Sequence, residues 1–191
     1  MARILPLPPE DWSPEVLEAL AAMRPANPRH PLPPRGQGRP KARNALGTLA
    51  RHPELLRAFN TFNGHILFAS SLSPRQRELL VLRVASVRNS EYEWRQHAIL
   101  AGDAGIDGDD VARIALGPEA PGWSAPDRAM LRAVDELVGE GVVSDPTWAT
   151  LADELDERQL MDLVFTVGAY DLLAMAFRSF DIELDDDLTR P

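Results

Sequence analysis

The sequence predicts an all-α protein, and three observations lead to this prediction. Apolar residues recur at helical spacing, as in Leu55, Leu56, Phe59, Phe62 and Ile66. Many such segments follow a serine, aspartate or histidine and then a proline, which is typical of a helix N-cap and first turn. No alternation of apolar and polar residues extends beyond about four residues, so no β-strand is predicted.

Composition narrows the range of functions. A chain of 191 residues suits one domain, or one domain with an arm. A net charge of −9 argues against nucleic acid as a partner. The chain has no cysteine, which excludes thiolate nucleophiles, thiol peroxidase chemistry and sulfur metal sites. We find no apolar run of about 18 residues and no signal-peptide core, so we expect a cytoplasmic protein without a membrane partner.

The N-terminal 43 residues form a Pro-rich arm, with 10 of the 17 prolines of the chain. One short helix is predicted after Ser13, over residues 15–23. The segment that follows is basic and has no acidic residue: Arg24, Arg29, Arg35, Arg39, Lys41 and Arg43. It is either a solvated linker or an arm that wraps the body or a neighbouring subunit and brings an arginine to an anionic substrate.

From Asn44 onward the pattern predicts helix after helix. The expected helices cover about 53–67, 74–88, 90–101, 107–116, 124–139, 145–155 and 156–180. The last is apolar over much of its circumference, which predicts burial on several sides and contact with another subunit. We therefore divide the chain into an arm (1–43), a helical domain (44–180) and an acidic tail (181–191).

Four polar residues around one predicted turn are the main candidates for chemistry. Ser90, Glu93 and His97 share one face of a helix, at i, i+3 and i+7. Glu78 lies near the start of the preceding helix, so a short turn brings it beside them. A carboxylate next to an imidazole can fix its tautomer, and a second carboxyl group in an apolar site can stay protonated at neutral pH. Such a set can move a proton on and off carbon or oxygen.

Other interpretations of the same residues remain open. Ser90 and Glu93 match a capping box, in which their side chains only satisfy backbone donors. His97 can equally be a core histidine. Glu78, Glu93 and His97 can also supply three oxygen and nitrogen ligands to a metal ion, although no second histidine lies at helical spacing from His97.

Several separated segments resemble the carboxymuconolactone decarboxylase family, which includes the AhpD-like alkylhydroperoxidases. They are Arg77-Glu78-Leu79, Ser90, Tyr92-Glu93-Trp94 and His97, together with Asn44-Ala-Leu, His52-Pro-Glu-Leu-Leu56, Trp148 and Gly168-x-Tyr170. In the peroxidase branch a glutamate precedes a C-x-x-C pair and a histidine. These positions correspond to Glu78, to Ser90 and Glu93, and to His97, so both redox sulfurs are missing here.

The resemblance implies an AhpD-like helical bundle built of helical hairpins, assembled as a homo-oligomer such as a dimer, trimer or hexamer. It also implies acid–base chemistry without a cofactor, as in the decarboxylase branch, on a small anionic organic acid or lactone. His97, Glu93 and Glu78 are the expected catalytic residues. The expected substrate-binding residues are Ser90, Arg95, Tyr92, Trp94 and Tyr170. The alternatives are a non-catalytic helical oligomer that binds a ligand or protein, and a metal-dependent enzyme.

Overall fold

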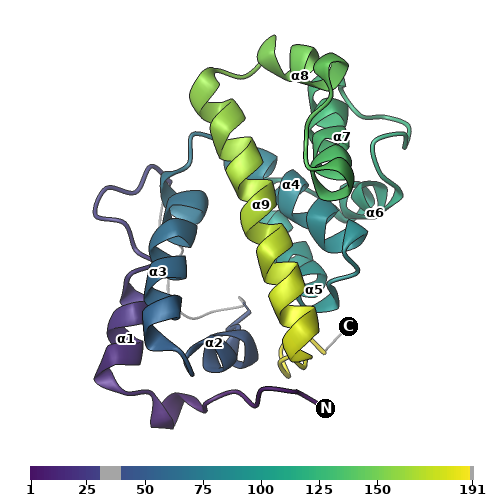
Figure 1. The fold of residues 1–191 in the computed structure, drawn as a ribbon. Coiled ribbons are helices and arrows are strands. Elements are labelled where there is room, and N and C mark those ends of the chain that lie inside the picture. The colour runs from purple at the N-terminus through teal and green to yellow at the C-terminus, as the bar shows by residue number, and fades with distance from the viewer. Residues whose placement is uncertain (31–39, 190–191) are drawn as a thin grey trace. The chain divides into compact units, whose positions relative to one another are not determined.

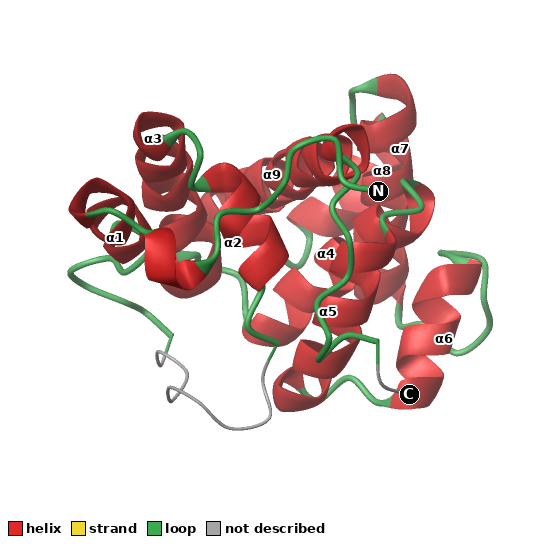
Figure 2. Cartoon of the chain, turned by 90° about the horizontal axis from the view of Figure 1, so that it is seen from below, coloured by secondary structure: helices red, strands yellow, loops and turns green. Residues whose placement is uncertain are grey.

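The computed structural model describes residues 1–30 and 40–189, and every regular element in these ranges is a helix (Figures 1 and 2). The elements are η1 (Pro9–Asp11), α1 (Pro14–Ala21), α2 (Arg43–Leu49), α3 (Pro53–Gly64), the π-helical η2 (His65–Ala69), α4 (Pro74–Val87), α5 (Glu91–Ala101), η3 (Gly102–Ala104), α6 (Gly108–Leu116), α7 (Ala125–Glu140), α8 (Asp145–Ala152) and α9 (Glu157–Phe180). The predicted all-α class is therefore confirmed. Arg35 and Arg39 of the basic segment lie outside the described residues.

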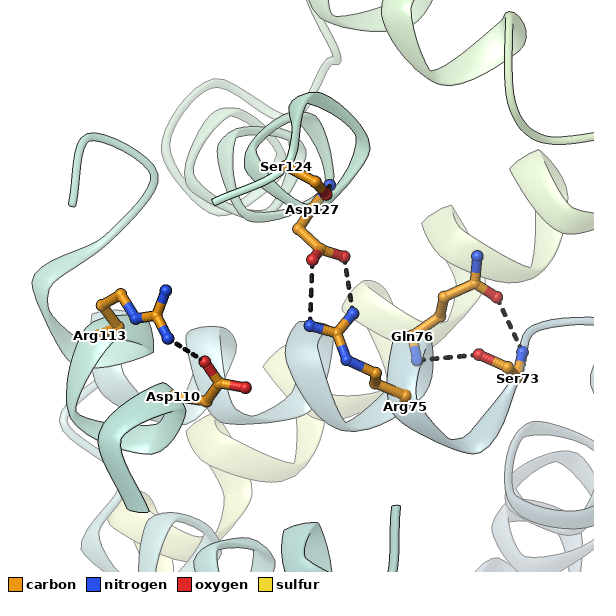
Figure 3. Close-up of polar contacts among 7 residues, drawn as sticks. All are labelled: Ser73, Arg75, Gln76, Asp110, Arg113, Ser124 and Asp127. Atoms are coloured by element: carbon orange, nitrogen blue, oxygen red, sulfur yellow. Dashed lines mark hydrogen bonds and ion pairs between the residues drawn. The ribbon is translucent and has the colours of Figure 1, made fainter. Parts of the chain in front are cut away.

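Most predicted helix starts are confirmed by capping hydrogen bonds. The hydroxyl of Ser13 accepts from Val16 N, and Ser124 caps α7 in the same way. Ser73 and Gln76 form a reciprocal capping box at α4 (Figure 3). The sequence did not predict α2 as a separate element, because its N-cap, Ala42, is left-handed (φ 51°) and offers no capping side chain.

The chain forms two compact units, residues 1–70 with 176–191, and residues 71–175. In the first, α1 packs on α3 around Val16, Ala19 and Leu56. The acidic tail belongs to this unit, where Asp185 accepts from the backbone N–H of Asn44 at 2.8 Å. The arm, domain and tail boundaries predicted at 43 and 180 stay a prediction.

Helix α4 is the centre of the second unit and packs against α5, α6 and α7. It is buried on nearly all sides, which explains why its apolar residues form no single stripe. The core around it consists of Leu79, Leu82, Ala101, Ile106, Ile114, Ala120, Trp123 and Leu131. At its start, Arg75 donates two hydrogen bonds to Asp127 of α7, at 2.8 and 3.0 Å (Figure 3). Helix α4, which carries Glu78 of the candidate site, is therefore held against α7 at a defined position.

Helix α9 corrects the expectation that the chain has no apolar segment long enough to span a membrane. It is long and apolar enough to cross a membrane by length and composition, with a mean hydropathy of 1.6 over its most apolar window. More than half of that window is buried in the protein, as expected for a core helix, and such a helix is weak evidence for a membrane span. Within the second unit, Asp162 anchors α9 by accepting from both N and Oγ of Ser71 at 2.6 Å.

A glycine near the end of α3 allows close packing on the chain after α1. A Cβ added at Gly64 would lie 2.9 Å from the carbonyl carbon of Met23 and closer still to its oxygen. Because backbone must shift to relieve this clash, we expect Gly64→Ala to lower the free energy of unfolding by about 1–3 kcal/mol. Thermal unfolding followed by circular dichroism measures the effect.

Gly139, in α7, is the matched control, because a Cβ there meets nothing within 4 Å. We expect Gly139→Ala to raise stability by roughly 0.5–1 kcal/mol, through helix propensity alone. Equal melting temperatures for the two alanine variants would show that the contact of Gly64 with Met23 does not constrain the fold.

Candidate active site

The predicted turn between α4 and α5 does bring the four polar residues together. Asn89, in the left-handed region (φ 51°), closes the turn, a conformation that asparagine tolerates better than most residues. Glu78 from α4 and Glu93 from α5 are each 2% exposed, and His97 is 5% exposed. The two carboxyl groups and the imidazole are therefore removed from bulk water.

Glu78 and His97 form a buried ion pair or hydrogen bond, with 2.7 Å between His97 Nδ1 and Glu78 Oε2. The other oxygen, Oε1, accepts from Nε and Nη2 of Arg77 at 3.2 and 3.1 Å. Burial by itself raises the pKa of Glu78, but His97 and Arg77 outweigh it, and the net pKa is lowered. Since Glu78 is ionised, Nδ1 carries the shared proton and Nε2 is left as the exchangeable nitrogen.

Tyr170 of α9 fixes the other side of the imidazole. Its ring meets that of His97 edge to face, with 5.1 Å between centroids and an interplanar angle of 88°. Burial, and then the nearby Glu78 carboxylate, raise the pKa of Tyr170, so its hydroxyl stays protonated. The predicted pocket residue Tyr170 therefore lies against the candidate base, where it limits rotation of the ring.

Glu93 is the unusual member of the group. Neither of its oxygens, nor Oγ of Ser90, has a hydrogen-bond partner among the described residues. Burial raises the pKa of Glu93 to about 8; the nearby Ser90 hydroxyl opposes this shift and the carboxylate of Asp171 adds to it. Glu93 is therefore a neutral acid near pH 7, held in the interior.

The capping box expected from Ser90 and Glu93 is wrong. Ser90 does precede α5, but its side chain makes no capping hydrogen bond. Both side chains turn into the protein instead, because tertiary packing around Glu78 and His97 places that face of α5 in the core. Local spacing alone did not distinguish these two outcomes.

Three charged residues near the site had no predicted catalytic or substrate-binding role. Arg88 forms a two-pronged ion pair with Asp171 of α9. Its Nε donates to Oδ1, and its Nη2 donates to Oδ2 at 2.9 Å. Asp171 is also the charge that acts on Glu93. Arg77 was visible in the sequence next to Glu78, but only the structure shows that its guanidinium binds that carboxylate.

The remaining predicted substrate-binding residues are dispersed. Ser90 and Trp94 line a groove of about 280 Å³, together with Ala85, Ser86, Asn89, Glu91 and Ala115. Tyr92 is buried. Arg95 is exposed and pairs with Glu91 on its own helix, at 3.0 Å. Arg95 therefore lies on the surface, away from the buried face of α5 that carries Glu93 and His97.

The described residues contain no group of three or more His, Asp or Glu side chains arranged to hold a metal ion. Glu93 and His97 share a face of α5 and Glu78 comes from α4, but the three are not arranged as a ligand set. The chemistry that this arrangement can perform with its own groups is proton transfer, because it combines an oriented imidazole with a neutral carboxylic acid.

The part of the chain that carries the candidate site matches a known protein family. Residues 53–136, which contain Glu78, Glu93 and His97, match the sequence model of the carboxymuconolactone decarboxylase family. This match is to the family that the resemblance indicated, and the matched segment lacks the C-x-x-C pair. No curated protein sequence matches the chain.

Solved structures share the fold at low sequence identity. The debrominase Bmp8 is 14% identical, with a TM-score of 0.73 over 97% of this chain and 93% of its own. A cysteine-to-alanine variant of Bmp8 has been solved with 2,3,4-tribromopyrrole. An uncharacterised peroxidase-related protein from Ralstonia eutropha JMP134, with an alkylhydroperoxidase AhpD core, is 17% identical, with a TM-score of 0.67 over 76% of this chain and 78% of its own. These likenesses confirm the AhpD-like fold.

Proposed function

We propose that this chain is a cysteine-independent acid–base enzyme, a lyase or isomerase that acts on a small anionic organic acid or lactone. The observation that supports this most is the 2.7 Å contact of His97 Nδ1 with the buried, ionised Glu78. This contact orients the imidazole and leaves Nε2 to accept or donate a proton. Glu93, on the same face of α5, supplies a second group that is protonated at neutral pH.

The proposed chemistry balances without an external electron donor. In a decarboxylation, the bond to the carboxylate carbon breaks and CO₂ leaves. Its electron pair stays on the neighbouring carbon, in conjugation with a carbonyl group, and that carbon takes a proton from His97 or Glu93. In an isomerisation, His97 removes a proton from one carbon and Glu93 returns one to another. Neither route needs the thiols that this chain lacks.

The groove at Ser90 is the entry that we propose for the substrate. Ser90 lines this groove and also shares the helix face of Glu93 and His97. Its buried hydroxyl has no hydrogen-bond partner among the described residues. We propose that oligomer formation and a cytoplasmic location accompany this activity.

Solvent deuterium incorporation is the test of this proposal. The protein is incubated in D₂O with a panel of lactone acids and cyclic enol acids, and carbon-bound deuterium and CO₂ release are followed by NMR and mass spectrometry. We expect exchange or decarboxylation for at least one compound. His65→Asn, at an exposed histidine, is the control and should behave as wild type. If no compound exchanges or perturbs the His97 imidazole signals, the acid–base proposal is wrong.

One observation favours a second candidate, a non-catalytic helical protein that binds a ligand or partner. Glu78, Glu93 and His97 are almost fully buried, as in a structural polar network. Such a network predicts that His97→Ala unfolds the protein and that no compound of the panel is turned over. An enzyme predicts loss of turnover with the fold retained.

A further inference from the structure

Helix α2 has no N-cap of its own. The residue at its N-cap position, Ala42, has no polar side chain and makes no capping hydrogen bond. The first turn contains no acidic residue, and Arg43 places a cation at the positive end of the helix dipole. With seven residues, α2 is also shorter than the roughly 12–15 residues at which an isolated helix becomes marginally stable in water. Its stability therefore depends on contacts from elsewhere in the chain.

The acidic tail supplies the missing cap. Oδ1 of Asp185 accepts a hydrogen bond from the backbone N–H of Asn44 at 2.8 Å. Asn44 is the second residue of α2, and its N–H is one of those that an N-cap side chain normally satisfies. Just before the N-cap position, the backbone N–H of Lys41 donates to Oδ2 of Asp187 at 3.1 Å. Two carboxylates of the tail therefore take the place of a local cap.

The contact between the tail and α2 is reciprocal. Nδ2 of Asn44 donates to the carbonyl oxygens of Glu183 and Leu184, at 3.0 and 3.3 Å, and so fixes the backbone of the tail. The tail then turns, with the N–H of Leu188 donating to the carbonyl of Asp185 at 2.9 Å. Asp185 is 6% exposed and Leu188 is 2% exposed, so both are anchored in the protein. The arrangement resembles a capping box whose two halves lie 141 residues apart in the sequence.

Helix α2 in turn holds the segment around Leu7. The N–H of Leu7 donates to the carbonyl of Gly47 in α2 at 2.9 Å. This approach requires glycine, because a Cβ at Gly47 would clash with the carbonyl oxygen of Leu7 and lie 2.9 Å from Cβ of Pro6. Loss of the helical geometry of α2 would therefore also release the amide of Leu7.

We propose that the acidic tail is a conformational latch, and that α2 is folded only while Asp185 is docked on it. Docking and helix formation form one cooperative step, because α2 lacks a cap and the described residues of the tail form no helix. Few hydrogen bonds hold the latch, so it opens at a lower free energy than the whole fold. The tail, α2 and Leu7 belong to the first compact unit, whereas the candidate site lies in the second. Opening of the latch is therefore independent of the proposed chemistry.

Hydrogen–deuterium exchange of the whole chain, followed by mass spectrometry and NMR, is the test. Asp185→Ala removes the acceptor for the N–H of Asn44. We expect the amides of residues 46–50 to exchange at least about 10-fold faster in this variant, the effect of losing an N-cap. The amide of Leu7 should also exchange faster, because its acceptor belongs to α2. Asp185→Asn keeps an acceptor oxygen and should stay within about threefold of the wild-type rates.

Asp186→Ala, at the exposed neighbouring residue, is the matched control, because it removes the same charge and leaves the cap in place. Its α2 amides, and the amides of α4 and α5 in every variant, should exchange at wild-type rates. Unchanged exchange of α2 in Asp185→Ala would show that α2 folds without the tail and would overturn the proposal. An equal rise in Asp186→Ala would overturn it as well, because the effect would then be one of net charge. So would a rise of the same size in α4 and α5, which would mean general destabilisation.

Discussion

Replacement of His97 by asparagine is expected to lower kcat by about 10²–10⁴-fold, the usual contribution of a positioned general acid or base. Asparagine keeps a donor near the position of Nδ1, so the hydrogen bond to Glu78 can persist, but it removes Nε2. The variant should therefore stay folded and lose mainly turnover, with a smaller change in KM. Steady-state kinetics on the substrate found by deuterium exchange measures this effect.

His97→Gln gives a second measurement of the same assignment. Glutamine places its amide near Nε2 and fits the contact with Glu78 less well, so we expect lower stability than for His97→Asn, with a similar loss of kcat. Normal turnover in both variants would remove His97 from the mechanism. Unfolding of both variants, with the fold of His65→Asn intact, would make His97 a structural residue.

The second large effect that we expect is a loss of stability with rising pH, caused by the buried carboxyl group of Glu93. Its pKa is about 8 in the folded protein and 4.5 in the reference state, so between these values the folded state holds a proton that the unfolded state has lost. Stability from this group is fully present below about pH 4.5 and is lost as the pH rises toward 8. Each pH unit in this window lowers the free energy of unfolding by about 1.4 kcal/mol, so the total loss is at most about 5 kcal/mol.

Glu93→Gln should remove this dependence, because the amide is nearly isosteric and does not ionise. The difference in unfolding free energy, variant minus wild type, is expected to rise by roughly 1 kcal/mol per unit from pH 5 to 8 and then to level off. Urea unfolding at several pH values measures it, and contributions common to both proteins cancel in the difference.

Glu91→Gln is the matched control, two residues away on the exposed side of α5. Its stability should differ from wild type by no more than about 0.5 kcal/mol at every pH. Glu78 does not interfere in this window, because its lowered pKa gives a stability contribution that is lost only as the pH falls below 4.5. Parallel pH curves for wild type and Glu93→Gln would show that Glu93 is ionised in the folded protein.

Local sequence signals were sufficient for the helices and for the location of the site. Serine and aspartate caps followed by proline determine where most helices begin, since capping depends on residues within one turn. Helical periodicity likewise placed Ser90, Glu93 and His97 on one face, and the turn after α4 placed Glu78 opposite them. The absence of cysteine alone excluded the thiol chemistry of the peroxidase branch.

Only the tertiary structure decided what these residues do. Whether Glu93 caps its helix or enters the core depends on contacts between distant segments, and packing around Glu78 and Tyr170 leaves it buried and unpaired. Arg95 turns outward to Glu91, whereas Arg77 turns inward to Glu78. For α9, composition predicted a helix apolar on nearly all sides, and packing then separated its buried residues, such as Tyr170, from exposed ones such as Leu172. Spacing fixes which side chains share a face, but the rest of the fold decides what that face meets.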